Sequence, residues 1–175
     1  LHIANGSMYH YEYDEDDVNL FYHNNGDGSF TEMSAISGLD DHGDGRASAV
    51  LDINNDGYSD LIMINVWRGD IQLYRNNNSG NNWITFHLVG TTSNRNGIGT
   101  RIKLEAGSLP PQLKELNPGT SYGSSSSIRL GFGLGQESLV DRITIRWPSG
   151  TIQELYDVSV NQILTITEPK QPSVR

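Results

Sequence analysis

The chain has 175 residues, a formal net charge of -9 and no cysteine. An acidic chain is a poor partner for nucleic acid or for anionic membrane surfaces, and it suits a cation ligand better. The lack of cysteine excludes disulfides, thiolate zinc sites and cysteine nucleophiles, and no apolar run approaches the ~20 residues of a membrane helix, so we expect no membrane insertion.

The first half of the chain contains an imperfect internal repeat. Leu1–Gly6 echoes Leu61–Val66, and Leu20–Gly28 echoes Gln72–Gly80. Each unit reads as a strand, a loop, a strand, an Asn/Gly turn and a further strand, which is typical of propellers and solenoids. An acidic loop precedes Leu61 and nothing precedes Leu1, so we expect the chain to be the C-terminal part of something longer.

The acidic loop has the spacing of an ion-binding loop. Oxygen side chains fall at alternate positions, with Gly57 where a sharp turn needs a left-handed backbone. An EF-hand would need Glu at the position of Met63, so the loop is predicted to join strand to strand. The alternative is an Asx-rich turn without metal. The predicted Ca²⁺ ligands are Asp52, Asn54, Asp56, the Tyr58 carbonyl and Asp60.

After residue 90 the Asn/Asp-rich pattern stops and a second set of strands is predicted. We expect a repeat region at 1–90, a β domain at 91–168 and a tail at 169–175, with the run from Glu168 onward frayed. Alternation of apolar and polar residues predicts buried strand faces. These faces are Ile84/Phe86/Leu88, Ile102/Leu104/Ala106, Ile128/Leu130/Phe132/Leu134 and Ile143/Ile145/Trp147.

Two glycine-rich motifs resemble catalytic or cofactor signatures, but their context does not fit. Gly119–Gly123 satisfies G-x-S-x-G, yet a proline precedes it, serines follow it, and every histidine lies earlier in the chain. Gly131–Gly135 lacks the spacing of a dinucleotide loop. We expect a glycine turn and a strand whose glycines allow a close neighbour, and no enzyme.

Other acidic clusters leave a second cation site open. Asn24–Gly28 is predicted to be a hairpin turn, with a second cation loop as the alternative. Asp14–Asp17 is predicted to be either a solvent-exposed acidic surface or a weaker cation site. For Asp40–Asp44 the sequence leaves a turn, an exposed acidic surface and a cation site open.

Trp147 before a Pro-x-Gly turn is predicted to pack in the core or at the turn, with stacking on a sugar as the alternative. Trp67 and Trp83 leave a carbohydrate-binding face open. Asn5 and Asn77 begin N-glycosylation sequons, which matter only in a eukaryotic secreted chain.

Two family resemblances cover nearly the whole chain. The run VLDINNDGYSDLIMIN resembles the calcium loop of the FG-GAP/VCBS repeat of integrin-type β-propellers, and LFYHNNGDGSFTEMSAISGL resembles the hairpin between two such blades. NRNGIGTRIKLEAG, SYGSSSSIRLGFGLG, VDRITIRWPSG and VNQILTI together resemble the ASPIC/UnbV domain. The resemblance implies an extracellular, Ca²⁺-binding propeller with a C-terminal β domain, and it assigns the same five ligands.

The expected fold class is all-β, with partial β-propeller blades followed by a small antiparallel β-sandwich or barrel-like domain. The expected function is a non-catalytic, calcium-binding recognition or scaffold module, extracellular or at the cell surface, which meets a protein or glycan surface. Two alternatives stay open. One is an accessory part of a secreted enzyme whose active site lies on other blades, and the other is a self-assembling subunit of an extracellular filament or surface layer.

Overall fold

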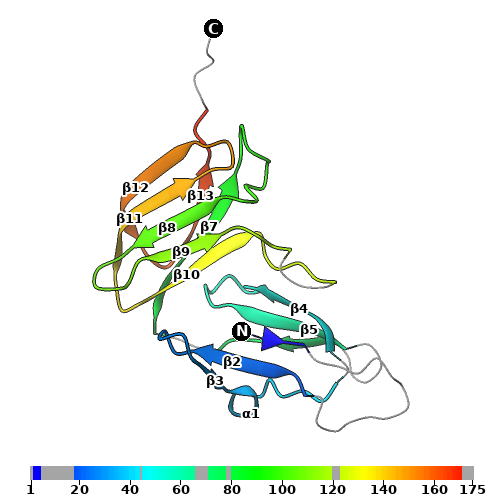
Figure 1. Ribbon diagram of the computed structural model, residues 1–175. Coiled ribbons are helices and arrows are strands. Elements are labelled where there is room, and N and C mark those ends of the chain that lie inside the picture. The colour runs from blue at the N-terminus through cyan, green and yellow to red at the C-terminus, as the bar shows by residue number, and fades with distance from the viewer. Residues whose placement is uncertain are drawn as a thin grey trace. The chain divides into compact units, whose positions relative to one another are not determined.

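The structure is a computed structural model, and it describes residues 2–4, 18–43, 45–65, 71–77, 80–119 and 123–170 (Figure 1). The chain forms two compact units whose segments interleave along the sequence. The first unit contains residues 1–51, 60–76 and 119–126, and the second contains 52–59, 77–118 and 127–175. The domain boundary expected at residues 90 and 91 remains a prediction, because the units are built from interleaved segments.

The first unit contains two antiparallel sheets of three strands each. The first sheet has the order β1 (His2–Ile3), β2 (Leu20–Asn24), β3 (Phe30–Glu32). The short helix α1 (Ser34–Ser37) follows it. The second sheet has the order β4 (Gly45–Leu51), β5 (Asp60–Asn65), β6 (Ile71–Tyr74).

The repeat predicted from the sequence is visible in these strands. Of the two echoed Leu-rich runs, the first contains β1 and the second covers β5 except for its first residue. Of the echoed Asn/Gly runs, the first contains β2 and the second covers β6 except for its first residue. Asn24–Gly28 forms the turn of the β2–β3 hairpin, in which Asn24 pairs with Phe30 and Gly26 has a φ of 85°. The hairpin prediction for this run is confirmed.

The second unit contains a three-stranded and a four-stranded sheet. The first has the order β10 (Arg129–Gly135), β7 (Asn82–Val89), β13 (Gln162–Thr167), and β13 runs parallel to β7. The second is antiparallel, with the order β12 (Ile152–Ser159), β11 (Leu139–Arg146), β8 (Arg101–Glu105), β9 (Gln112–Glu115).

The core of the second unit is made by the strand faces that alternation predicted. Three of the predicted inward faces are at most 2% exposed at every residue. They are Ile84/Phe86/Leu88 on β7, Ile102/Leu104/Ala106 on and just after β8, and Ile143/Ile145/Trp147 on and just after β11. Phe86 and Phe132 meet edge to face with ring centroids 5.6 Å apart. Ile128 is an exception at 37% exposed, because β10 begins one residue later at Arg129. The all-β class is confirmed, since α1 is the one helix in the described residues.

Trp147 is 1% exposed, and its Nε1 donates a hydrogen bond to Oε1 of Gln153 at 3.1 Å. Burial confirms its core packing and excludes sugar stacking at this residue. Gly131–Gly135 lies on β10 as predicted, but the close neighbour is absent. A Cβ at Gly131 would approach nothing nearer than Oγ1 of Thr85 at 3.5 Å, and one at Gly133 would meet open space.

Glu168 corrects the expectation of a frayed end. It is 1% exposed, and one carboxylate oxygen accepts hydrogen bonds from the backbone N–H groups of residues 91, 92 and 93 at 2.7–2.8 Å. Its other oxygen accepts from the hydroxyls of Ser93 and Ser149. Burial alone would raise the pKa of Glu168, but these hydrogen bonds outweigh it and hold the pKa at about 2.

Several sequence predictions fall on residues outside the described ranges. They concern Asp14–Asp17, Asp44, the sequon at Asn5, residues 120–122 of the G-x-S-x-G motif, Trp67, and the tail beyond Lys170. In the second sequon only Asn77 is described, and it is exposed. Across the described parts of the chain, we find no helix long and apolar enough to cross a membrane.

Candidate metal centre

The acidic loop connects β4 to β5, so it joins strand to strand as the sequence predicted. The antiparallel pairing of these strands brings Leu51 opposite Asp60 at the base of the loop. Two loop residues have left-handed backbones, Asn55 with a φ of 58° and Gly57 with a φ of 87°. The left-handed turn predicted at Gly57 is confirmed, and asparagine is the non-glycine residue that best tolerates such a backbone.

Loop oxygens turn inward onto the loop's own backbone. The Asp52 carboxylate accepts hydrogen bonds from the N–H groups of Asp56 at 3.1 Å and Gly57 at 2.9 Å. The Asp56 carboxylate accepts from the Tyr58 N–H at 2.9 Å and from the Asn54 amide at 2.7 Å. Three of the predicted ligands therefore share one small turn. Carboxylate and amide oxygens in this arrangement fit a hard cation such as Ca²⁺.

Asp60 has a different local environment. It is the first residue of β5, it is 1% exposed, and its Oδ1 accepts a hydrogen bond from the Asn76 N–H at 2.9 Å. Asp60 is grouped with the first unit, whereas Asp52 to Ser59 are grouped with the second. Within the described ranges, no three His, Cys, Asp or Glu side chains form a metal-binding group. The five-ligand set, which includes an amide and a backbone carbonyl, remains a prediction.

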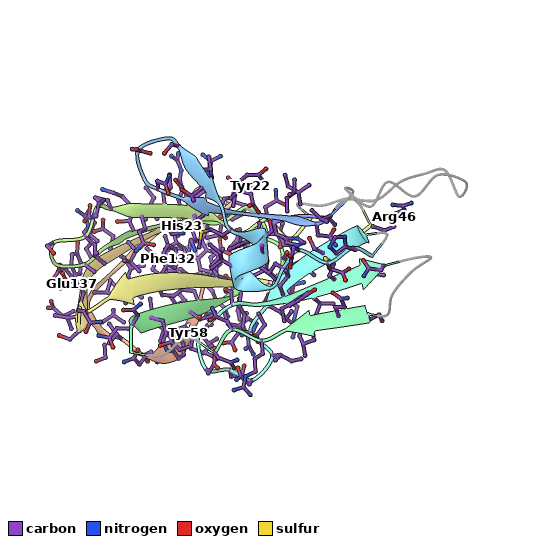
Figure 2. The ribbon with its side chains drawn as sticks, turned by 90° about the horizontal axis from the view of Figure 1, so that it is seen from below. Tyr22, His23, Arg46, Tyr58, Phe132 and Glu137 are labelled. Carbon is purple, nitrogen blue, oxygen red and sulfur yellow. The ribbon has the colours of Figure 1, made fainter. Side chains whose placement is uncertain are left out.

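Three contacts within the second unit hold the loop from outside. The ring of Trp83 lies so close to Gly57 that an added Cβ would come within 1.9 Å of it. The hydroxyl of Tyr58, labelled in Figure 2, donates to the Asn81 carbonyl at 2.8 Å. Arg129 donates to Oδ1 of Asn55 at 2.6 Å. The loop is thus shaped by strands β7 and β10 and the residue before β7, as well as by its own hydrogen bonds.

Spacing within the loop could not predict these outer contacts, because the hydrogen-bond partners of Tyr58 and Asn55 lie 23 and 74 residues further along the chain. One signal was present. Asn55 is not one of the predicted metal ligands, and Gly57 has no side chain. Both positions could therefore contact other parts of the protein.

Asp41, from the second acidic cluster that the sequence left open, is the centre of an amide network in the first unit. Its carboxylate accepts hydrogen bonds from the Asn65 and Gln72 side chains, both at 2.7 Å, and from the Gly43 N–H at 3.0 Å. The Asn19 amide, which is fully buried, approaches the same carboxylate at 3.4 Å. Amide donors therefore satisfy both oxygens, and this indicates a structural role for Asp41.

Comparison with known families agrees with this architecture. Residues 6–63 match the FG-GAP-like repeat family, and residues 90–173 match the ASPIC and UnbV family. The chain is therefore similar to an FG-GAP-like repeat over its first part and to the ASPIC and UnbV family over its second. FG-GAP-like repeats form β-propeller blades, and the repeated strands β1–β3 and β4–β6 are consistent with that. The candidate loop lies near the end of the FG-GAP-like match, whereas Trp83 and Arg129 lie on strands after that match.

The chain is similar to three proteins named cartilage acidic protein 1. The Homo sapiens protein is 43% identical and the Mus musculus protein 41% identical, each over 61 residues. These matches cover 34% of this chain and 9% of each relative. The Xenopus tropicalis protein is 33% identical over 78 residues, covering 44% of this chain and 12% of the relative. The chain therefore matches only a small part of the length of these relatives.

Proposed function

We propose that this chain is a non-catalytic, calcium-binding extracellular module that serves recognition or scaffolding. The observation that carries the proposal is the loop at residues 52–58. The Asp52 carboxylate accepts hydrogen bonds from the backbone of Asp56 and Gly57, and the Asn54 amide donates to the Asp56 carboxylate, so two carboxylates lie in one small turn. Like charges at that range repel unless a cation neutralises them, and a flexible set of protein oxygens suits the larger shell of Ca²⁺.

Calcium in this loop would act structurally. The ligands we propose are Asp52, Asn54, Asp56, the Tyr58 carbonyl and Asp60. When bound, Ca²⁺ neutralises the three carboxylates and fixes the start of β5, while Trp83 and Arg129 already restrict the loop's shape. Because such a site binds the folded chain and not the unfolded one, occupancy adds to the free energy of unfolding.

The extracellular setting and the partner class are also part of the proposal. The FG-GAP-like match and the name cartilage acidic protein support a matrix setting, since cartilage consists mostly of extracellular material. The net charge of -9 argues against nucleic acid as partner, because phosphate groups would be repelled. We propose a protein or glycan surface instead.

The test is a calorimetric titration of the calcium-stripped chain with CaCl₂ and, in parallel, with MgCl₂. The Asp52→Asn variant should lose most of the calcium heat, because Asp52 is the first ligand. Asp27→Asn is a matched control, since Asp27 also accepts hydrogen bonds within an exposed turn, from Ser29. It should titrate like the wild type. Equal heats for all three proteins, or no heat at all, would refute the calcium site.

A further inference from the structure

The chain's net charge of -9 belongs entirely to the residues of the first unit. The segments of that unit contain 3 Lys and Arg residues against 12 Asp and Glu residues, whereas the segments of the second unit contain 9 of each. The second unit is therefore neutral as a whole. Because exposed charges act over only about 8–10 Å at physiological salt, the local arrangement of charges decides which ligands this unit attracts.

Strand directions bring three segments of the second unit to the same end. β13 runs parallel to β7, and β8 begins opposite the last residue of β11. Residues 90–100, 147–151 and 168–170 therefore lie together, beyond the ends of β7 and β13 (Figure 1). Two hydrogen bonds join these segments. The Ser149 N–H donates to Oγ of Ser93 at 3.1 Å, and the Glu168 N–H donates to the Val89 carbonyl at 2.9 Å.

Basic side chains gather at this end of the second unit, which we call the basic end. Its exposed basic residues are Arg95, Arg101, Arg146 and Lys170. The opposite end, where β8 and β12 finish and β11 begins, carries the acidic residues Glu105, Glu137, Asp141 and Asp157. Between the two ends, Lys103 and Arg142 each form an ion pair with a glutamate. The second unit is thus neutral in total but polarised along its strands.

The acids at the basic end already have partners. Glu115 forms an ion pair with Arg101 at 2.7 Å, and Glu168 is 1% exposed with both carboxylate oxygens hydrogen-bonded. Arg146 lies directly opposite Arg101 in the β8–β11 pairing, and Ile152 is its partner on β12. Like charges in such positions repel each other. Among the residues that the structure describes, none forms an ion pair with Arg146. A bound anion would remove the repulsion.

We propose that the basic end binds a short stretch of an acidic glycan, with its carboxylate or sulfate groups at Arg146, Arg95 and Lys170. A guanidinium group matches the paired oxygens of such anions and holds them through two hydrogen bonds at once. This inference rests on the part of the proposed function that gives the chain a protein or glycan partner. It does not depend on the calcium site.

The composition of the basic end favours a glycan over a protein surface. Protein interfaces are centred on Trp, Tyr and Arg side chains that fill pockets of the partner. Trp147, the aromatic residue of these segments, is buried, and the large apolar side chains exposed at this end are Ile98 and Ile152. The exposed Thr92 and Asn96 supply hydroxyl and amide groups that can pair with sugar hydroxyls.

The test is an NMR titration of the full, calcium-stripped chain with a heparin hexasaccharide in low-salt buffer. The amide signals of residues 91–98 and 146–151 should shift, and added NaCl should weaken the binding. Uncharged maltohexaose should cause no shift. Shifts confined to other parts of the chain, or no shift at all, would overturn the proposal.

An acidic peptide distinguishes a glycan ligand from a protein ligand. Hexaglutamate carries carboxylates without sugar hydroxyls, so it should bind more weakly than the hexasaccharide. Equal or tighter binding of hexaglutamate would indicate an acidic protein segment as the ligand and would overturn the glycan.

Two variants of the chain test the position of the site. Arg146→Gln should weaken hexasaccharide binding about three- to fivefold, which is what one exposed ion pair contributes. Arg142→Gln is the matched control, because Arg142 lies on the same strand and is paired with Glu154. It should bind like the wild type. Equal weakening by the two variants would mean that total charge governs binding, and the basic end would then be wrong.

Repeating the titration with CaCl₂ separates this site from the acidic loop. Hexasaccharide binding should be the same with and without calcium, so a failure of the calcium site leaves this result unchanged. Binding that appears only with calcium would place the glycan at a bound cation and overturn the basic end as its site.

Discussion

The Trp83 ring lies against Gly57 at a distance that leaves no room for a side chain on the glycine. The contact joins the turn of the acidic loop to the first residues of β7, both within the second unit. Position 57 therefore requires glycine for two reasons. Its φ of 87° is a left-handed backbone that glycine adopts readily, and the Trp83 ring occupies the space that a Cβ would need.

Gly57→Ala should therefore be strongly destabilising. The left-handed backbone costs about 1–2 kcal/mol for alanine, and displacing the ring costs about 1–3 kcal/mol more. Gly80→Ala is the matched control, because Gly80 has a φ of 95° but nothing within 4 Å of an added Cβ. Chemical denaturation should show the larger loss of unfolding free energy for Gly57→Ala. Equal losses would mean that the Trp83 contact adds nothing.

The same contact makes Trp83 a reporter of calcium. A cation that fixes the loop changes the surroundings of the ring above Gly57, so the tryptophan emission should change when CaCl₂ is added. Trp147 is 1% exposed in the core and should not respond. The change should disappear in Trp83→Phe. A calcium-dependent change that persists in Trp83→Phe would place the response at another tryptophan.

Glu168 should make stability depend on pH. Its folded pKa of about 2 is below the usual 4.5, so its contribution is present above pH 4.5 and is lost as the pH falls toward 2. Glu168→Gln should cost on the order of 2 kcal/mol near pH 7, since it places an amide donor among backbone donors. Glu115→Gln, at an exposed ion pair with Arg101, should cost much less.

Urea unfolding near pH 7 and near pH 3 measures this directly. The gap between the wild type and Glu168→Gln should narrow at the lower pH, because the wild-type carboxylate then begins to be protonated in the unfolded chain. A gap that is the same at both pH values would show that the ionised form of Glu168 is not what stabilises the loop at residues 91–93.

Asp41→Asn tests whether the second acidic cluster is structural. Replacing the carboxylate weakens its hydrogen bonds to Asn65, Gln72 and Gly43, for an expected loss of about 1–3 kcal/mol. The loss should be equal with and without CaCl₂, whereas Asp40→Asn should change stability little. A loss that appears only in the presence of calcium would indicate a second cation site.

Local sequence pattern predicted the parts of this protein that depend on local chemistry. Alternating apolar residues located the buried faces of β7, β8 and β11, and the Asn-Gly and Asp-Gly pairs located the β2–β3 turn. Glycine at position 57 predicted the left-handed turn of the loop. In each of these cases the physical cause lies within a few residues of the effect.

Features that depend on distant partners escaped prediction. Glu168 looked like the start of a polar tail, yet its partners are the backbone donors of residues 91–93. Likewise, the repeat pattern could not show that β7 pairs with β10 and β13, because a strand's own sequence does not name its neighbours.

We propose above that the acidic loop binds calcium, and bound calcium should then stabilise the fold. Differential scanning calorimetry of the calcium-stripped chain, with and without CaCl₂, tests it most directly, with Asp56→Asn measured alongside. Calcium should raise the melting temperature of the wild type, and Asp56→Asn should lose most of that rise. Identical melting temperatures for the wild type with and without calcium would contradict it.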